Sequence, residues 1–101
     1  MEYTKTIIGP VCNLNMQGKF TFSDHNNFKE VIKVFDEGGI NQVDIDLSQV
    51  EFVDSAALGL LLLIRDEAKK NSKKIILKQP QGQVKKMFEI SRFYELFEVV
   101  D

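Results

Sequence analysis

A serine follows an aspartate at the centre of residues 52–59, whose sequence is FVDSAALG. The residues before this pair are typical of a strand and those after it of a helix. The N-terminus of a helix presents backbone N–H groups without intrahelical partners and carries about half a positive charge. Ser55 could therefore cap the helix, or it could accept a phosphoryl group whose oxygens would bind those N–H groups. The pattern leaves open whether Asp54 or Ser55 is the N-cap.

The helix predicted after this pair has more leucines than one buried face needs. Residues 60–63 are all leucine, and at about 100° per residue their side chains point in nearly all directions. The expected inward stripe is Ala57, Leu61, Ile64 and Ala68. Leu58 and Leu62 then fall toward the side of Ser55 and Gly59. Either neighbouring helices cover these two leucines, or they form an exposed apolar patch of the kind that marks a protein interface.

A hairpin is predicted at the beginning of the chain. Residues 2–8 are rich in β-branched and aromatic types, and a Gly-Pro turn signal follows them. Residues 11–17 alternate in the manner of a second strand, and Gly18 is expected to end it. The single cysteine, Cys12, lies in this strand and is expected to be a small buried hydrophobe in a reducing compartment.

A helix and a strand are predicted before the Asp-Ser pair. The helix begins at Ser23 or Asp24 and runs to about Glu37. Its apolar residues at helical spacing are Phe28, Val31, Ile32, Val34 and Phe35. Residues 43–47 alternate strictly between aliphatic residues and aspartates, so they predict a strand with one polar face.

The helix after the Asp-Ser pair runs to about Asn71, and residues 74–78 predict another strand. A third helix is expected to carry on one face the apolar residues Val84, Met87, Phe88 and Ile90. Ser91 is expected to cap a last short helix, and residues 98–100 form either a final strand or a tail. An aromatic cluster at helical spacing, expected in the core, consists of Phe88, Phe93, Tyr94 and Phe97.

The predicted order of elements is β-β-α-β-α-β-α-α. Strands that alternate with helices indicate an α/β fold, here a mixed, mostly parallel sheet opened by the N-terminal hairpin and packed with about four helices. The 101 residues are expected to form a single domain, 1–101.

Charge and composition argue against two classes of partner. The net charge is -2, from 13 Lys+Arg and 15 Asp+Glu, which is far from the basic surface of a nucleic-acid-binding protein. The first residues lack the features of a signal peptide, and the longest apolar run, 56–64, is too short to span a bilayer. We therefore expect a cytoplasmic protein without direct membrane insertion.

Catalytic and metal chemistry is not indicated. Asp46 and Asp54 lie near strand ends and could hold Mg²⁺, but so few oxygen ligands favour a polar strand face and a helix cap instead. His25 is the only histidine and is expected to be a surface residue near a helix start. The chain has no Gly-rich phosphate loop, no nucleophile elbow and no metal-spaced Cys/His set. We expect neither an enzyme nor a cofactor.

Residues 46–48 (DLS), Val50 and 52–59 together resemble the signature of STAS domains. More narrowly they resemble the bacterial anti-sigma-factor antagonists, the SpoIIAA-like proteins, in which a strand leads through Asp-Ser-(Ser/Thr/Ala)-Gly-Leu-Gly into a helix. Other stretches that resemble the family are 18–20 (GKF), 80–91 and 97–99 (FEV). The resemblance therefore covers essentially the whole chain and implies the STAS fold.

The resemblance implies a phosphorylation switch at Ser55, the serine after the motif aspartate. The unphosphorylated form would bind a serine kinase of the partner-switching type, which is also the anti-sigma factor. The phosphorylated form would release it, and a PP2C-like phosphatase would reset the cycle. The residues implied in partner binding are Asp54, Ser55, Ala56, Leu58, Gly59 and Leu62. The protein would act as a monomer or weak homodimer.

The chain departs from the family pattern at three positions. Thr21 stands where many members carry an aspartate near the phosphorylation site, which affects kinase or nucleotide contact. Ala56 replaces a frequent second hydroxyl residue, so Ser55 is the single acceptor in the motif. Ala57 replaces a common glycine and should stiffen the start of the helix.

Two other functions fit the same residues. The chain could be a STAS-type structural subunit that docks constitutively on a membrane transport system, with Ser55 serving as a helix cap alone. A weaker alternative is a small nucleotide-binding sensor.

Overall fold

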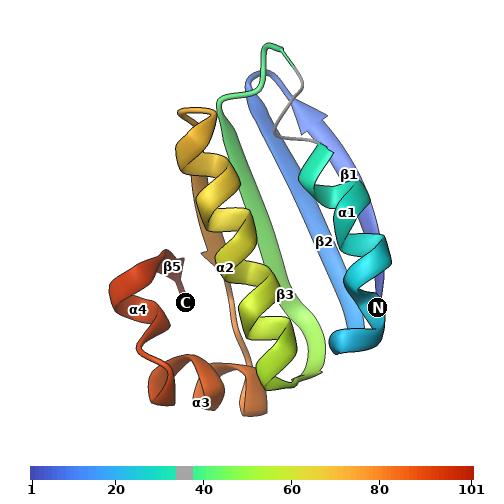
Figure 1. Cartoon of the computed structure of the whole chain (residues 1–101), viewed down its shortest axis with the longest axis vertical. Helices are drawn as coiled ribbons and strands as arrows, with labels where there is room; N and C mark the ends of the chain where they lie inside the picture. The colour runs from blue at the N-terminus through green and yellow to red at the C-terminus, as the bar shows by residue number, and fades with distance from the viewer. Residues whose placement is uncertain (34–37) are drawn as a thin grey trace.

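The computed structural model describes residues 1–33 and 38–101. Within these residues five strands form one sheet, in the same order as along the chain, and helices lie against it (Figure 1). The connections between the parallel strands are helical, as the predicted alternation of strands and helices requires. The predicted α/β fold is therefore confirmed.

The sheet is mostly parallel. β1 (Glu2–Ile8) and β2 (Val11–Phe20) form the predicted antiparallel hairpin. β2 pairs in parallel with β3 (Gln42–Val53), β3 with β4 (Lys74–Lys78) and β4 with β5 (Glu98–Val100). The last residues thus form a strand and not a tail.

Gly18 does not end β2, which is a correction to the prediction. The strand continues to Phe20, and its register against β3 shifts between Asn15 and Gln17 and again between Gly18 and Lys19. Gly18 has a φ of 86°, a left-handed conformation that glycine adopts at little cost, so the glycine accommodates an irregularity inside the strand. At both shifts the extra residue lies in β3, and the two shifts together place Phe20 opposite Val53, the last residue of β3.

The helix before β3 begins with one 3₁₀ turn, η1 (Phe22–Asp24), and continues as α1 (His25–Ile32). Its predicted start falls within the 3₁₀ turn. Its expected end near Glu37, with the apolar Val34 and Phe35, lies outside the described residues. The other apolar residues of this helix, buried or half-buried in the structure, are Phe28, Val31 and Ile32.

The long helix α2 (Ser55–Lys70) lies beside α1 over one face of the sheet (Figure 1). The structure buries all four residues of its predicted inward stripe, Ala57, Leu61, Ile64 and Ala68. β2 also has one buried and one exposed face: Leu14 and Met16 are buried, while Asn15 and Gln17 are exposed. No helix of the described residues is long and apolar enough to cross a bilayer.

The third helix, α3 (Gly82–Ile90), packs against the end of β3. Val84 and Phe88 are buried and Met87 is half-buried, as the helical spacing predicts. Ile90 is 71% exposed, so the prediction of a common apolar face is wrong for this residue. Because Ile90 follows Phe88 by two positions, it points about 200° away around the helix.

A last short helix, α4 (Phe93–Leu96), follows a left-handed residue. Arg92, with a φ of 57°, occupies its N-cap position, while Ser91 ends α3. The expectation that Ser91 caps this helix is therefore wrong. The backbone reversal at Arg92, rather than a side-chain cap, sets where α4 begins.

Three phenylalanine rings in contact join α3 to the C-terminal segment. The ring centroids of Phe88 and Phe93 lie 5.0 Å apart, and those of Phe93 and Phe97 5.1 Å apart. All three rings are buried, as predicted. Tyr94 is exposed and its hydroxyl donates to Asp101 Oδ1 over 3.1 Å, so its assignment to the core is wrong.

Replacing Phe88 by alanine should lower the free energy of unfolding by about 3–5 kcal/mol, because it removes a buried ring and leaves a cavity. Ile90→Ala, on the same helix, is the matched control and should change stability by less than about 0.5 kcal/mol. Urea denaturation of both variants measures the difference. A comparable loss for Ile90→Ala would contradict the exposed placement of Ile90.

Candidate functional site

Asp54 is the N-cap of α2. Its backbone is extended (φ -101°, ψ 176°), and its Oδ1 accepts a hydrogen bond of 2.8 Å from the backbone N–H of Ala57. Ser55 is the first residue of the helix and is exposed. The interpretation of Ser55 as the cap is therefore wrong, and the choice that the sequence left open falls on the aspartate. The serine occupies the position at which helix N–H groups are least satisfied.

The second oxygen of the same carboxylate holds a neighbouring loop. Asp54 Oδ2 accepts a hydrogen bond of 3.2 Å from the backbone N–H of Phe22, and the N–H of Asp54 donates to the carbonyl of Phe20 over 3.3 Å. One side chain thus joins the start of α2 to the segment that leaves β2. With the register shifts between β2 and β3, Phe20 lies opposite Val53, directly before Asp54.

Thr21 lies in this loop, directly before Phe22. Its N–H donates to Asp24 Oδ2 over 2.9 Å, and its hydroxyl lies 2.8 Å from that of Ser23. Asp24 is buried. The threonine therefore serves the local turn through its backbone and adds a hydroxyl, rather than a carboxylate, beside the site.

Phe22 is an exposed aromatic residue at the site that the sequence pattern did not single out. Its side chain is 62% exposed and stacks on His25, with the ring centroids 5.1 Å apart. His25 is half-buried and is the first residue of α1, so it lies at a helix start as predicted. The hydrogen bond from the Phe22 N–H to Asp54, a residue far away in sequence, identifies Phe22 as a neighbour of the junction.

The leucines of α2 divide unequally between core and surface. Leu58 is 6% exposed, so neighbouring elements cover it and it offers almost no contact area for a partner. Leu62 is half-buried, and Leu63 is 52% exposed. The sequence thus predicted a surplus of leucines correctly but did not identify Leu63 as the exposed one.

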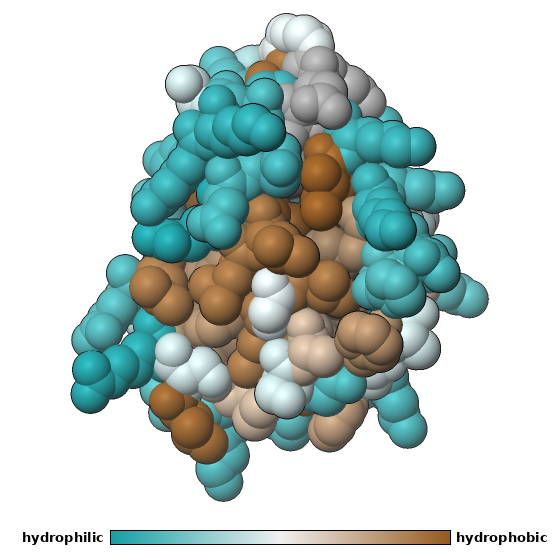
Figure 2. All heavy atoms as spheres, in the orientation of Figure 1, coloured by the Kyte–Doolittle hydropathy of each residue, from teal (hydrophilic) through white to brown (hydrophobic). Residues whose placement is uncertain are grey.

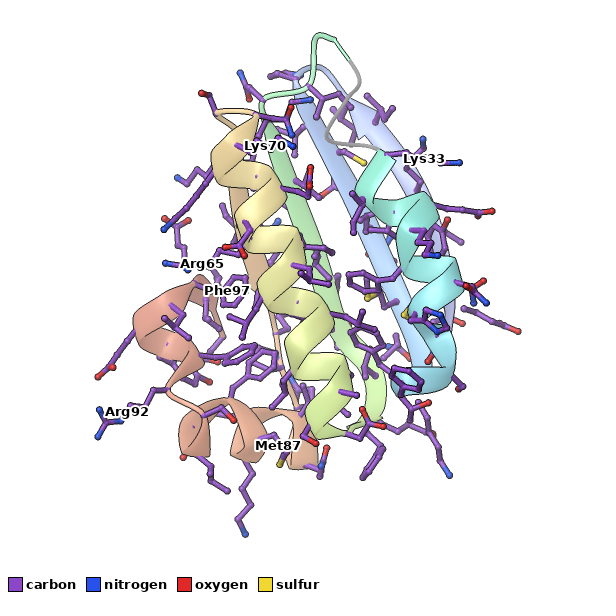
Figure 3. The ribbon with its side chains drawn as sticks, in the orientation of Figure 1. Lys33, Arg65, Lys70, Met87, Arg92 and Phe97 are labelled. Carbon is purple, nitrogen blue, oxygen red and sulfur yellow. The ribbon has the colours of Figure 1, made fainter. Side chains whose placement is uncertain are left out.

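One face of α2 combines the serine with apolar residues. We call it the Ser55 face; it consists of Ser55, Ala56, Gly59, Leu62 and Leu63. At about 100° per residue these side chains lie within roughly 100° of Ser55 around the helix. Figure 2 shows a hydrophobic area over α2 that is bordered by hydrophilic residues. The basic residues Arg65 and Lys70 lie toward the other end of the helix (Figure 3).

A metal site at this junction is not formed by the described residues. Asp46 and Asp54 are separated by eight residues along β3, a distance of about 26 Å in an extended strand. The Oδ1 of Asp46 instead accepts from the backbone N–H of Ser48 over 2.8 Å. Within the part of the chain that the structure describes, no three acidic, histidine or cysteine side chains are grouped to hold a metal ion.

The side of the junction away from β2 is held by α3. The side-chain amide of Gln83 accepts from the N–H of Val53 over 3.0 Å and donates to the carbonyl of Val53 over 2.9 Å. Val53 directly precedes Asp54. Sequence reasoning missed Gln83, since a glutamine near a helix start has no pattern that reveals a contact thirty residues away.

Solved structures of two kinds share this fold. SpoIIAA, an anti-sigma factor antagonist, in its unphosphorylated form has a TM-score of 0.74 and 16% identity, over 99% of this chain and 88% of that chain. The phosphorylated form of this Bacillus cell fate determinant gives the same score and identity, over 99% and 92%. A sulfate transporter family protein from Wolinella succinogenes has a TM-score of 0.80 and 18% identity, over 96% and 81%. At such identities the likeness establishes the fold alone.

Sequence comparison establishes the family. A STAS-domain containing protein of Pseudomonas aeruginosa (strain UCBPP-PA14) is 32% identical over 93 residues, which cover 90% of this chain and 89% of that protein. The family model of the STAS domain matches residues 2–101. The chain therefore belongs to the STAS domain family.

Proposed function

We propose that this protein is a phosphorylation-controlled binding protein of the anti-sigma-factor-antagonist type. Unphosphorylated, it binds a serine kinase of the partner-switching type that is also an anti-sigma factor; phosphorylation of Ser55 releases it, and a PP2C-like phosphatase restores binding. The observation that carries the proposal is an exposed serine at the N-terminus of a 16-residue helix whose cap is supplied by another residue, Asp54. The kinase and the phosphatase perform both chemical steps, so the protein itself has no catalytic role.

A phosphoryl group at Ser55 would be tolerated by the fold but would change the Ser55 face. It adds about -1.5 to -2 charges, which the helix N-terminus attracts. The same charges would lie next to the Asp54 carboxylate and on the same helix face as Leu62 and Leu63, about two turns further along α2. A partner surface that packs on a nearly neutral, apolar face would have to bury this charge, which is strongly unfavourable without a counter-charge. Release is the expected result.

Gly59 supports the use of this face for close contact. It is exposed in the middle of α2, one turn after Ser55, and a Cβ built on it would meet nothing within 4 Å. The fold of the free protein therefore gains nothing from this glycine, which costs a helix about 0.5–1 kcal/mol relative to alanine. A partner backbone that approaches α2 closely would account for the missing side chain.

A constitutive subunit of a membrane transport system is the second candidate. The likeness to a sulfate transporter family protein favours it. In such a subunit Ser55 would be an exposed first residue of α2, since Asp54 supplies the cap. In such a subunit, binding would not depend on the state of Ser55, so Ser55→Asp and Ser55→Ala would bind the partner equally. In the switch, Ser55→Asp loses binding and Ser55→Ala keeps it.

Because Asp54 and Ser55 have different roles, substituting each by alanine should affect the stability of the protein differently. Asp54→Ala should lower the free energy of unfolding by about 1 kcal/mol or more, because the N–H of Ala57 loses its cap. Ser55→Ala should stay within about 0.5 kcal/mol of wild type, as expected for an exposed position. Thermal and urea denaturation measure both. If the serine variant lost as much stability as the aspartate variant, Ser55 would have to be the cap.

Phosphorylation should occur on Ser55 alone. Wild-type protein incubated with ATP and a partner-switching serine kinase that binds it should gain the mass of one phosphoryl group, and Ser55→Ala should gain none. Ser23→Ala, which removes an exposed hydroxyl from the neighbouring loop, is the matched control and should be modified like wild type. An unmodified wild type in the presence of a bound, active kinase would rule out the switch.

Gly59→Ala should have effects of opposite sign on stability and binding. The alanine should raise the free energy of unfolding by roughly 0.5–1 kcal/mol and weaken kinase binding by about tenfold, since one added methyl group blocks close approach. Leu96→Ala, at an exposed leucine on α4, controls for the loss or gain of apolar surface elsewhere. Calorimetric titration with the kinase measures the affinities. Unchanged affinity of Gly59→Ala would remove this face from the contact.

A further inference from the structure

β3 extends beyond the strand that pairs with it on one side. Its pairing with β4 ends at Asp46 and Lys78, while its pairing with β2 continues to Phe20 and Val53. In the described residues, the last part of β3 therefore has a strand neighbour on the β2 side, whereas α3 packs against β3 near its end (Figure 1). Val53, the last residue of β3, is buried, so its backbone N–H and C=O groups require other partners.

The side chain of Gln83 replaces the missing strand at Val53. The N–H and C=O of one residue in a strand point in the same direction, so a neighbour must offer an acceptor and a donor together. A carboxamide offers both, and Gln83 makes both bonds, at 3.0 Å to the N–H and 2.9 Å to the carbonyl. Val53 itself is fully buried. The strand end is therefore fixed on the α3 side by one half-buried side chain.

These bonds act at the residue that precedes the cap. Val53 is followed by Asp54, whose own N–H donates to Phe20 on the opposite side. The direction in which the chain leaves the sheet and enters α2 is thus set by β2 on one side and by Gln83 on the other. A shift of Val53 would move the Asp54 carboxylate and the hydroxyl of Ser55 together.

We propose that Gln83 is a positioning residue for the Ser55 switch, which holds the acceptor hydroxyl in the orientation that phosphoryl transfer requires. The inference rests on the proposed function. Misplacing a reacting group by about 1 Å can cost roughly a hundredfold in rate, so a residue that acts only through Val53 can still control the reaction. Gln83 lies outside the Ser55 face, which makes its role separable from partner contact.

A thiol placed at position 55 tests the positioning without any partner. Ser55→Cys puts a titratable group at the first position of α2, where the helix N-terminus lowers the pKa of a thiol. This effect is confined to the first turn and depends on geometry. The pH profile of alkylation by iodoacetamide, followed by intact mass, reports the thiol pKa, and the protein without Ser55→Cys corrects for the buried Cys12.

Three changes are compared in the Ser55→Cys background. Gln83→Met removes both bonds to Val53 and should shift the alkylation profile toward that of an ordinary thiol. Gln83→Glu keeps the acceptor, loses the donor, and should give a smaller shift. Gln81→Met is the matched control, because Gln81 is exposed and its side-chain amide donates to the nearby Gln79 carbonyl over 3.3 Å. If both Gln83 variants folded and kept the profile of Gln81→Met, the proposal would be overturned.

The same Gln83 variants with the native serine are then phosphorylated by the kinase. Gln83→Met should lower kcat by about tenfold to a hundredfold with little change in KM, since the Ser55 face is intact. An equal loss through KM alone would assign Gln83 to partner contact and overturn the positioning role. The two experiments can also disagree. If Gln83→Met shifts the pH profile of thiol alkylation but the wild-type protein accepts no phosphate, Gln83 still orients position 55. The proposed phosphorylation switch is then rejected.

Discussion

The Asp54 carboxylate is the interaction on which the rest of the site depends. A helix that starts at the edge of a sheet must find partners for its first N–H groups, and one oxygen of Asp54 serves the N–H of Ala57. The other oxygen serves the N–H of Phe22 and so fixes the loop that follows β2. Because one residue does both, the adjacent Ser55 is not required for either task. The chain thereby separates the group that builds the helix start from the group that is available for chemistry.

Two segments distant in sequence converge on the strand end that carries that aspartate. β2 lies beside it because register shifts that add residues to β3 place Phe20 opposite Val53. α3 holds Val53, the residue before the aspartate, through the amide of Gln83. The sheet sets the direction in which the chain runs, and the side-chain hydrogen bonds of Asp54 and Gln83 fix the position of the strand end. An exposed serine between such supports is mobile only to the extent that these few bonds allow.

Local periodicity was sufficient to predict the elements and the buried stripe of α2, because burial on one face of a helix or sheet repeats at a fixed spacing. It was not sufficient where the same residues are compatible with two different backbone conformations. Gly18 is typical both of a strand end and of an irregularity within a strand, and only the pairing with β3 decides. The choice between Asp54 and Ser55 as cap, and the exposure of Leu63 rather than Leu58, depend on neighbours that the local pattern does not contain. The contact of Gln83 with Val53 has no local signal at all.

The two faces of α2 have no residue in common. Its buried stripe fixes the helix to the sheet, whereas Ser55, Gly59 and Leu63 repeat every fourth position on the outside. In the proposed switch, substitutions on the outer face would therefore act on recognition with little effect on folding. Related domains in one cell would then be insulated from one another's partners by changes within about two helical turns. The same separation makes the outer face a natural place to engineer orthogonal signalling pairs on an unaltered scaffold.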